Sequence, residues 1–228
     1  MKYMGSKRRY VKYLLPIILE NRKNGQWYVE PFVGGCNVIE NVKGNRAGID
    51  INRYLISMWQ ALQDGWIPPE NISEEEYVDI RDNKECYPEY LIGYVGFNLS
   101  YAGKWWGGYA RDGARKRNYG DEAFRHIMKQ VPKIKDVFFV DGDYLEMEFK
   151  DICTIYCDPP YQNATQYKDR FDHDSFWNWC RERRAEGHKI FISEYSAPED
   201  FKCVWEKAVN NTLVQNTGSK QGVERLFV

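Results

Sequence analysis

Short apolar runs alternate with amphipathic segments at both ends of this chain. Runs rich in Val, Ile, Phe and Tyr predict buried strands at residues 27–32, 46–51, 137–140, 152–157 and 189–193. Apolar positions at helical spacing predict helices between them, at residues 9–21, 37–42, 53–63 and 174–186. The tail favours three further strands, including an antiparallel pair, at residues 204–209, 212–215 and 223–228.

The middle of the chain has a different pattern. Three helices are expected there, at residues 73–83, 89–101 and 121–131, and Ser73 with Glu76 gives the first a capping-box start. Residues 102–119 are rich in Gly, aromatic residues and Arg and predict a loop or hairpin. Strand and helix alternation on both sides of this segment predicts an α/β fold: a doubly wound sheet with an inserted, mainly helical subdomain. The expected domains are 1–64 together with 137–228, and an insertion at 65–136.

The tetrapeptide Asp158-Pro159-Pro160-Tyr161 directly follows the apolar run at 152–157. It therefore lies just past the carboxyl end of a predicted strand, where open α/β sheets hold their ligands. The prolines stiffen the turn and leave its carbonyls free to accept hydrogen bonds. Asp158 can accept from an amino group, and Tyr161 offers a flat face to a planar base. The alternative is a proline-rich turn that only closes the strand.

A second strand-to-helix turn carries the glycines of Phe32-Val33-Gly34-Gly35. Glycines there let a ligand approach the backbone closely, and the absence of a phosphate-binding pattern favours a ligand without phosphates. Asp50 ends the next predicted strand, 16 positions after Gly34. An acid in that place commonly accepts hydrogen bonds from ribose hydroxyls. The alternative is a plain turn with Asp50 capping the following helix.

The composition is informative mainly through where the charged residues lie along the chain. The 228 residues have a net charge of -1, but basic side chains gather at 1–13 and 104–117 and acidic ones at 70–89. The aromatic content of 16% suits a surface or pocket that stacks on a flat ligand, although an aromatic core would explain it too. The 6 cysteines form no metal-binding pattern with the histidines. With no signal peptide or long apolar span, we expect a reduced cytoplasmic protein without structural metal or membrane contact. The compact size and short termini would suit a phage or mobile-element gene, and hence a bacterial or phage-infected cell.

Taken together, the chain resembles the D12-class, Dam-like family of N6-adenine DNA methyltransferases. Four stretches carry the resemblance in the family's order, and they span nearly the whole chain: Lys2-Tyr3-Met4-Gly5-Ser6-Lys7, Glu30-Pro31-Phe32-Val33-Gly34-Gly35, Ile49-Asp50-Ile51-Asn52 and Asp158-Pro159-Pro160-Tyr161. The resemblance implies a Rossmann-like methyltransferase sheet, S-adenosyl-L-methionine as cofactor and double-stranded DNA as partner. A cognate restriction endonuclease is a candidate second partner.

The resemblance also implies roles for individual residues. The implied catalytic residues are Asp158, Pro159, Pro160 and Tyr161, and the implied cofactor-binding residues are Tyr3, Lys7, Phe32, Gly34, Asp50, Asp143 and Asp158. The segment from Asn98 to Arg111 corresponds to one that lies at the DNA in the family. With the basic residues that follow it, the expected DNA contacts are Asn98, Tyr101, Lys104, Trp105, Arg111, Arg115, Lys116 and Arg117. A solvated basic loop whose tryptophans pack on the subdomain is the alternative.

Two positions depart from the family pattern. Cys36 stands where the family turn usually has its last glycine, and a positive φ there would strain a cysteine. Tyr3 stands in place of a tryptophan and keeps a stacking face.

The expected chemistry is direct in-line methyl transfer from the sulfonium to adenine N6. Asp158 and the carbonyl of Pro159 would accept the two N6 hydrogens, and Tyr161 would stack on a base flipped out of the duplex. No covalent intermediate is needed. The rival functions are an amino-methyltransferase acting on RNA or protein, which usually carries Asn in place of Asp158, and a catalytically inactive DNA-binding protein on the same scaffold.

Overall fold

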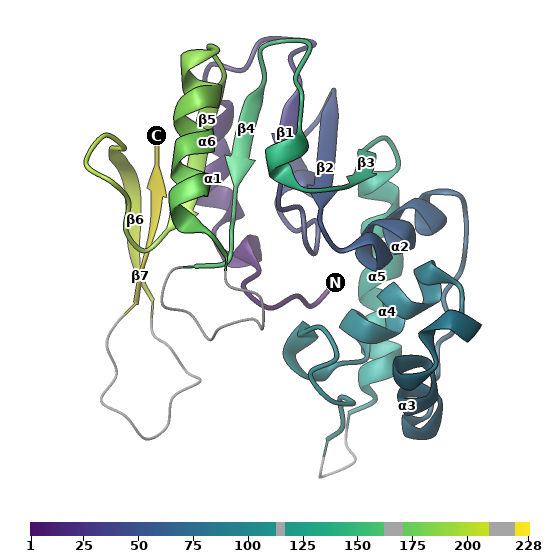
Figure 1. Ribbon diagram of the computed structural model, residues 1–228. Coiled ribbons are helices and arrows are strands. Elements are labelled where there is room, and N and C mark those ends of the chain that lie inside the picture. Colours follow the sequence, from purple (N-terminus) through teal and green to yellow (C-terminus); the bar gives the residue numbers. More distant parts are fainter. Residues whose placement is uncertain (113–116, 162–170, 210–221) are drawn as a thin grey trace.

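The computed structural model describes residues 1–112, 117–161, 171–209 and 222–228 (Figure 1). Its centre is a sheet of seven strands in the order β3-β2-β1-β4-β5-β7-β6. The strands are β1 (Tyr28–Glu30), β2 (Arg46–Asp50), β3 (Phe138–Asp141), β4 (Thr154–Cys157), β5 (Lys189–Glu194), β6 (Cys203–Val209) and β7 (Gly222–Phe227). The expected strand at 212–215 lies outside the described residues.

The strand directions confirm the doubly wound fold. β1 pairs in parallel with both β2 and β4, and the parallel pairing continues to β3 on one side and β5 on the other. The chain order therefore reverses between β1 and β4, which makes their carboxyl ends the topological switch point of the sheet. β7 runs antiparallel to both of its neighbours, β5 and β6.

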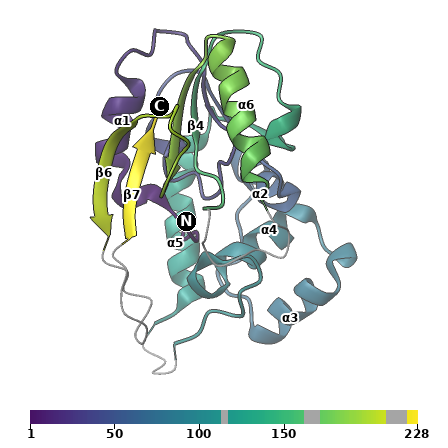
Figure 2. The same ribbon diagram turned by 60° about the vertical axis from the view of Figure 1, so that its left-hand side comes forward.

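Alternating side chains give the sheet two buried faces. Tyr28, Tyr156 and Phe191 point into one hydrophobic cluster, which also contains residues of α1 (Val11–Leu19), α2 (Arg53–Gln63) and α5 (Tyr119–Ile134). Val29, Ile155 and Ile190 point into the other, against α6 (His173–Ala185). Figure 2 shows α1 and α6 on opposite sides of the sheet. Because both faces are covered, the middle positions of the central parallel strands are mostly apolar, and the charged residues lie at the strand ends.

The segment between β2 and β3 adds α3 (Glu74–Asp82) and α4 (Glu89–Asn98) to α5. The capping box of α3 is confirmed: Ser73 Oγ accepts from the amide of Glu76 at 3.1 Å, and Glu76 Oε2 accepts from the amide of Ser73 at 2.7 Å. α4 packs so closely on α2 that a Cβ at Gly93 would lie 2.0 Å from the carbonyl oxygen of Tyr54. In Figure 1 these helices lie beside the carboxyl ends of the strands, with the N-terminal segment between them and the sheet.

Several element bounds differ from expectation for local reasons. The strand expected at 27–32 ends at Glu30, since Pro31 has no amide hydrogen to donate to a ladder. The helix expected at 37–42 is a 3-10 turn, Ile39–Asn41. The helix expected at 89–101 ends at Asn98, beyond which Ser100 forms an antiparallel bridge with Tyr109. That bridge makes the region after α4 hairpin-like, as expected.

Candidate active site

The glycine turn follows β1 and is shaped by the N-terminal loop. Gly34 has φ 46°, and a Cβ there would lie 2.7 Å from the ring of Tyr3. A Cβ at Gly35 would lie 2.6 Å from the Cβ of Tyr3. Tyr3 thus packs directly on the turn, at a distance that only glycine permits. Two side chains from elsewhere in the chain hydrogen-bond to the carbonyls of this turn. Trp59 Nε1 donates to the carbonyl of Gly34 at 3.1 Å, and Gln130 Nε2 donates to that of Gly35 at 2.8 Å.

Cys36 adopts the left-handed backbone conformation that would strain a residue with a side chain, as considered from the sequence. Its φ is 55°, and the residue is completely buried. Burial raises the pKa of its thiol well above the ordinary value. A left-handed residue with a side chain costs about 1–2 kcal/mol, so this turn is held by its surroundings.

Asp50 lies at the carboxyl end of β2 and reaches back to the glycine turn. Its Oδ2 accepts from the amide of Gly34 at 3.1 Å, and its Oδ1 accepts from the amide of Asn52 at 3.0 Å. Burial raises the pKa of Asp50 to about 6, against the opposing effect of these two hydrogen bonds. The cap of α2 is Asn52, whose side chain accepts from the amide of Leu55. Asp50 is therefore not the helix cap that the plain-turn interpretation required.

The turn from Asp158 to Tyr161 follows β4 and meets the N-terminal loop. Lys7 is 5% exposed, and its Nζ lies 2.8 Å from Oδ1 of Asp158. Burial raises the pKa of Asp158, and the Lys7 ammonium opposes that rise. For Lys7 itself, burial acts to lower the pKa, but Asp158 and the second carboxylate, Glu224, outweigh it and the pKa is raised. Pro159 is buried and Pro160 is exposed.

Tyr161 stands against three other side chains. Lys7 Nζ lies over its ring, 4.4 Å from the centroid, and the ring of Tyr195 meets it edge-on at 4.7 Å. Its hydroxyl donates to Oε1 of Glu224. The structure thus brings Lys7, Asp158 and Tyr161 together at the switch point.

Two predicted cofactor residues lie at the neighbouring strand ends. Phe32 packs among the rings of Tyr144, Phe171 and Phe176, with centroids 5.0 to 5.8 Å away. Asp143 follows β3, where Asp141 pairs in register with Asp50. Its Oδ1 accepts from the amide of Leu145 at 3.0 Å and begins a short 3-10 turn.

Sequence reasoning left four residues of this region without a role. Glu30 is buried at the end of β1, accepts from the hydroxyl of Tyr28 at 2.7 Å and has a pKa raised well above the ordinary value by burial. Three more residues contact the site: Tyr195, directly after β5, Glu224 of β7 and Trp59 of α2. An acid inside an apolar strand is a readable signal for Glu30 and Glu224, since unpaired carboxylates are rarely buried.

The predicted DNA-binding residues fall into three groups. Tyr101, Lys104, Arg111 and Arg117 are exposed. Trp105 packs between Tyr54 and Phe97, with centroids 5.7 and 4.7 Å away, so it belongs to the packing of the subdomain. Asn98 is 5% exposed and its amide contacts the sulfur of Met58, which places it inside the α2–α4 contact and not at the surface. Arg115 and Lys116 lie outside the described residues.

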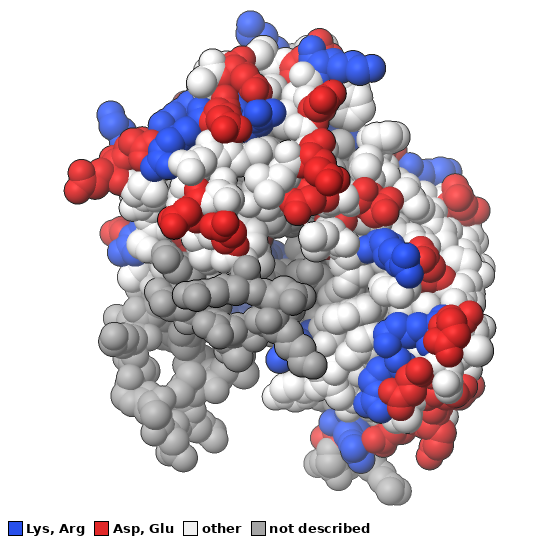
Figure 3. Space-filling model, in the orientation of Figure 1, with Lys and Arg blue, Asp and Glu red and all other residues white. Residues whose placement is uncertain are grey.

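The exposed arginines are held by carboxylates. Arg111 Nη2 lies 2.8 Å from Glu74 of α3, and Arg117 makes two hydrogen bonds, of 2.8 and 2.9 Å, to Glu122 of α5. Lys2 Nζ lies 3.0 Å from the same Glu122, whose pKa is lowered to about 2 by these hydrogen bonds. Over the visible face of this region, basic and acidic side chains are accordingly intermixed (Figure 3).

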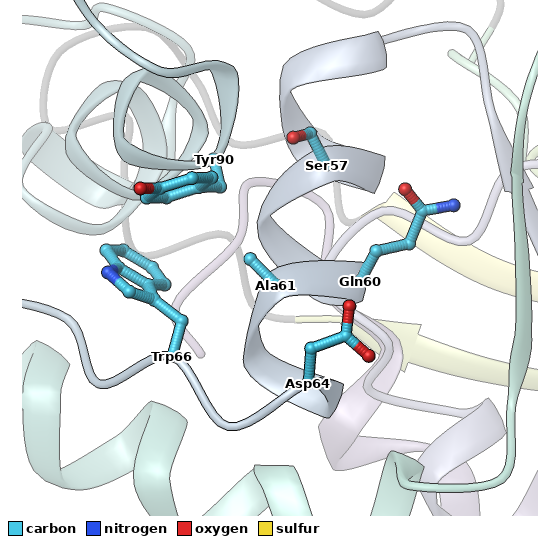
Figure 4. Close-up of a pocket in the computed structure, with 6 residues that line it drawn as sticks. All are labelled: Ser57, Gln60, Ala61, Asp64, Trp66 and Tyr90. Carbon is cyan, nitrogen blue, oxygen red and sulfur yellow. The ribbon is translucent and has the colours of Figure 1, made fainter.

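A pocket of about 390 Å³ lies elsewhere, beside the end of α2 (Figure 4). Trp66 and Tyr90 form an aromatic side of it, and Ser57, Gln60 and Asp64 project from α2. It shares no residue with the predicted site. Among the residues that the structure describes, no cluster of His, Cys, Asp or Glu could hold a metal ion, and no helix is long and apolar enough to cross a membrane.

These features define a class of protein. The sheet is doubly wound, and three features meet at its switch point: a glycine turn, a strand-end acid and an Asp-Pro-Pro-Tyr turn. This combination is typical of a Rossmann-like α/β methyltransferase. The profile of one family, the D12 class N6 adenine-specific DNA methyltransferases, matches residues 3–209. The chain belongs to this family and is an adenine-specific DNA methyltransferase.

Further comparisons give more distant likenesses. The presumed methyltransferase yhhF of Escherichia coli aligns with 96% of this chain and 84% of its own, at 9% identity and a TM-score of 0.37. SMU.472, a presumed methyltransferase solved in complex with SAH, aligns with 99% of this chain and 53% of its own, at 13% identity and a TM-score of 0.38. A sequence search of curated proteins found no match.

Proposed function

We propose that the residues at the β1 and β4 strand ends carry out methyl transfer from S-adenosyl-L-methionine to N6 of an adenine flipped out of duplex DNA. One observation carries the assignment: Lys7 joins the N-terminal loop, which packs on the glycine turn, to Asp158 of the catalytic turn. A cofactor beside Gly34 and an amine beside Asp158 would therefore be neighbours.

The residues of the first turn fit the cofactor. Asp50 presents an ionised carboxylate suited to two ribose hydroxyls, and Gly34 and Gly35 allow close approach to the backbone. We assign Tyr3, Lys7, Phe32, Gly34, Asp50 and Asp143 to cofactor binding. When bound, the cofactor supplies a methyl group on a positively charged sulfur.

Asp158 is the acceptor for the amine in this proposal. Its carboxylate and the carbonyl of Pro159 would take the two N6 hydrogens, so that the nitrogen lone pair is directed at the methyl group. Tyr161 would stack on the adenine. The proton leaves after the amine has been methylated and become acidic, so no strong base is required.

Segment 65–136 is the proposed target-recognition insertion. The exposed Tyr101 and Lys104 lie on a turn that packs on the N-terminal loop, where the amide of Met4 donates to the carbonyl of Gly103 at 3.3 Å. Contacts from this turn and from the basic side chains would offset the cost of unstacking the base, a few kcal/mol. A cognate restriction endonuclease stays a prediction.

Two rival functions are an amino-methyltransferase that acts on RNA or protein and an inactive DNA-binding scaffold. Asp158, in place of the asparagine usual in RNA and protein amino-methyltransferases, favours DNA adenine. The inactive-scaffold alternative draws on the strained Cys36, whose fully buried side chain lies in an ordered turn.

The test is methyl transfer from labelled S-adenosyl-L-methionine to unmethylated duplex DNA, followed by digestion to nucleosides. N6-methyladenine as product is the expected result. Methylation of RNA in place of DNA would refute the substrate assignment. Cofactor binding without transfer to any DNA sequence pool would favour the inactive scaffold.

A further inference from the structure

Glu224 is a buried carboxylate at the edge of the proposed active site. It lies on β7 and is 6% exposed. Burial raises its pKa, which the Lys7 ammonium opposes. A buried acid is retained at a substantial cost unless it is paired, so its partners indicate what it is there to hold.

Both partners of Glu224 belong to the proposed methyl-transfer machinery. Its Oε1 accepts the hydrogen bond of the Tyr161 hydroxyl, and the same oxygen lies 3.6 Å from Lys7 Nζ. Lys7 in turn contacts Asp158 at 2.8 Å, donates to the carbonyl of Gly5 at 3.1 Å and covers the ring of Tyr161. The Glu224 carboxylate therefore contacts both Lys7, which pairs with Asp158, and the hydroxyl of Tyr161, the proposed stacking residue.

We propose that Glu224 is a positioning residue for methyl transfer: it fixes the ring of Tyr161 through the phenol hydroxyl and holds Lys7 between two carboxylates. This inference rests on the proposed function of Asp158 and Tyr161.

The geometry explains why the ring needs an anchor. Lys7 lies over one face of Tyr161, and Tyr195 meets the ring at 85°. These two contacts restrain the ring itself, but neither one holds the hydroxyl at its far end. The hydrogen bond to Glu224 holds the hydroxyl. A ring fixed in this way can receive a base without first paying the entropy of becoming ordered.

The charges explain why a carboxylate suits this place better than a neutral acceptor. Lys7 carries one positive charge and faces two carboxylates, Asp158 and Glu224. Because Glu224 shares the Lys7 ammonium, Asp158 is neutralised less than it would be as the sole partner of Lys7. Asp158 therefore stays a stronger hydrogen-bond acceptor for an amine. The other titratable groups that act on this cluster are Glu30, Tyr156 and Tyr195.

The test is a double-mutant cycle on the full-length protein with Glu224→Ala, Tyr161→Phe and the combined variant. Single-turnover methyl transfer to a saturating unmethylated duplex is measured, with cofactor dissociation constants as a check on folding. Each single variant should lose about tenfold or more in rate. The combined variant should lose little beyond Glu224→Ala alone, because both changes remove the same Tyr161–Glu224 hydrogen bond and only Glu224→Ala also removes the Lys7 contact. Cofactor affinity should change by less than about threefold in all of them, because Lys7 keeps its contacts with Asp158 and with the carbonyl of Gly5.

Two further variants separate positioning from general destabilisation. Glu224→Gln keeps an oxygen for the Tyr161 hydroxyl and should recover part of the rate lost in Glu224→Ala. Glu206→Ala removes a carboxylate from neighbouring β6 that pairs with Arg225 at the surface, and should leave the rate unchanged.

Multiplicative losses in the cycle, or a Glu224→Ala rate within about twofold of the wild type, would overturn the inference while leaving the proposed function intact. An inactive wild-type protein that binds cofactor would instead overturn the proposed function, and with it the role of Glu224.

Discussion

The carboxylate of Asp50 accepts a hydrogen bond from the backbone amide of Gly34 at 3.1 Å. The contact joins the end of β2 to the turn after β1, so the acid expected to bind ribose also holds the glycine turn in place. Cofactor affinity and the shape of the turn should therefore change together when Asp50 changes.

Cofactor binding should weaken as pH falls, because the pKa of Asp50 is about 6. Above this value the carboxylate is ionised and can accept from ribose hydroxyls; below it, the protonated acid is a poorer acceptor. The dissociation constant should rise by up to about tenfold for each pH unit below 6. Titrations at pH 7.5 and pH 5 would measure this, and Asp50→Asn should bind weakly at both pH values. A wild-type affinity that does not change with pH would contradict the assignment.

Asp158→Ala should abolish methylation while leaving cofactor binding within about tenfold of the wild type. The change removes the acceptor that prepares the amine, and loss of one such group typically costs about a hundredfold or more in rate. Single-turnover transfer to unmethylated duplex is the measurement. Asp151→Ala, at the exposed opposite end of β4, is the matched control and should behave as the wild type. Substantial activity in Asp158→Ala would exclude its role as acceptor.

Glu122→Gln should strengthen DNA binding and make it more dependent on salt. Glu122 holds Arg117 and Lys2, and the neutral amide would release both cations toward phosphates. Each new phosphate contact should steepen the logarithmic salt slope by about 0.9. The gain should be modest, because exposed ion pairs contribute only about 0–1 kcal/mol.

The comparison requires two other variants. Removing the charges of Arg115, Lys116 and Arg117 should flatten the same slope, whereas Glu182→Gln on exposed α6 should leave it unchanged. If the slopes of Glu122→Gln and the wild type coincide, the DNA surface lies elsewhere.

At position 36, glycine should give a more stable protein than alanine. Both variants lose the buried thiol, but only glycine also removes the left-handed backbone cost of about 1–2 kcal/mol. Cys36→Gly should therefore unfold with a free energy within about 1 kcal/mol of the wild type, with Cys36→Ala below both. Denaturant unfolding measures all three. The reverse order would mean that the turn relaxes around a side chain without strain.

Much of the sheet and of the turns after β1 and β4 could be predicted because their signals are local. β-branched runs gave β1, β2, β4 and β5, and the residues that follow these runs fall at the switch point. The expectation about Cys36 was also local, because a glycine in the family turn indicates a positive φ at that position. The φ of 55° at Cys36 confirms it.

The contacts among distant residues could not be predicted in the same way. Lys7 and Glu224 meet only because β7 enters the sheet beside β5, which no pattern within either segment encodes. Asn98 was expected at the DNA because the segment from Asn98 to Arg111 resembles one that lies at the DNA in the family. It is buried because the close contact of α4 with α2 encloses the helix on all sides, an effect of tertiary packing.

The place of β7 between β5 and β6 constrains how the protein can be made. During synthesis on the ribosome, β6 is completed before the strand that connects it to the sheet, so the edge of β5 stays open until β7 has emerged. An open edge of this kind is a template for pairing with other chains. Chains that end before residue 222 should accordingly depend on chaperones, even though every parallel strand has already been synthesised.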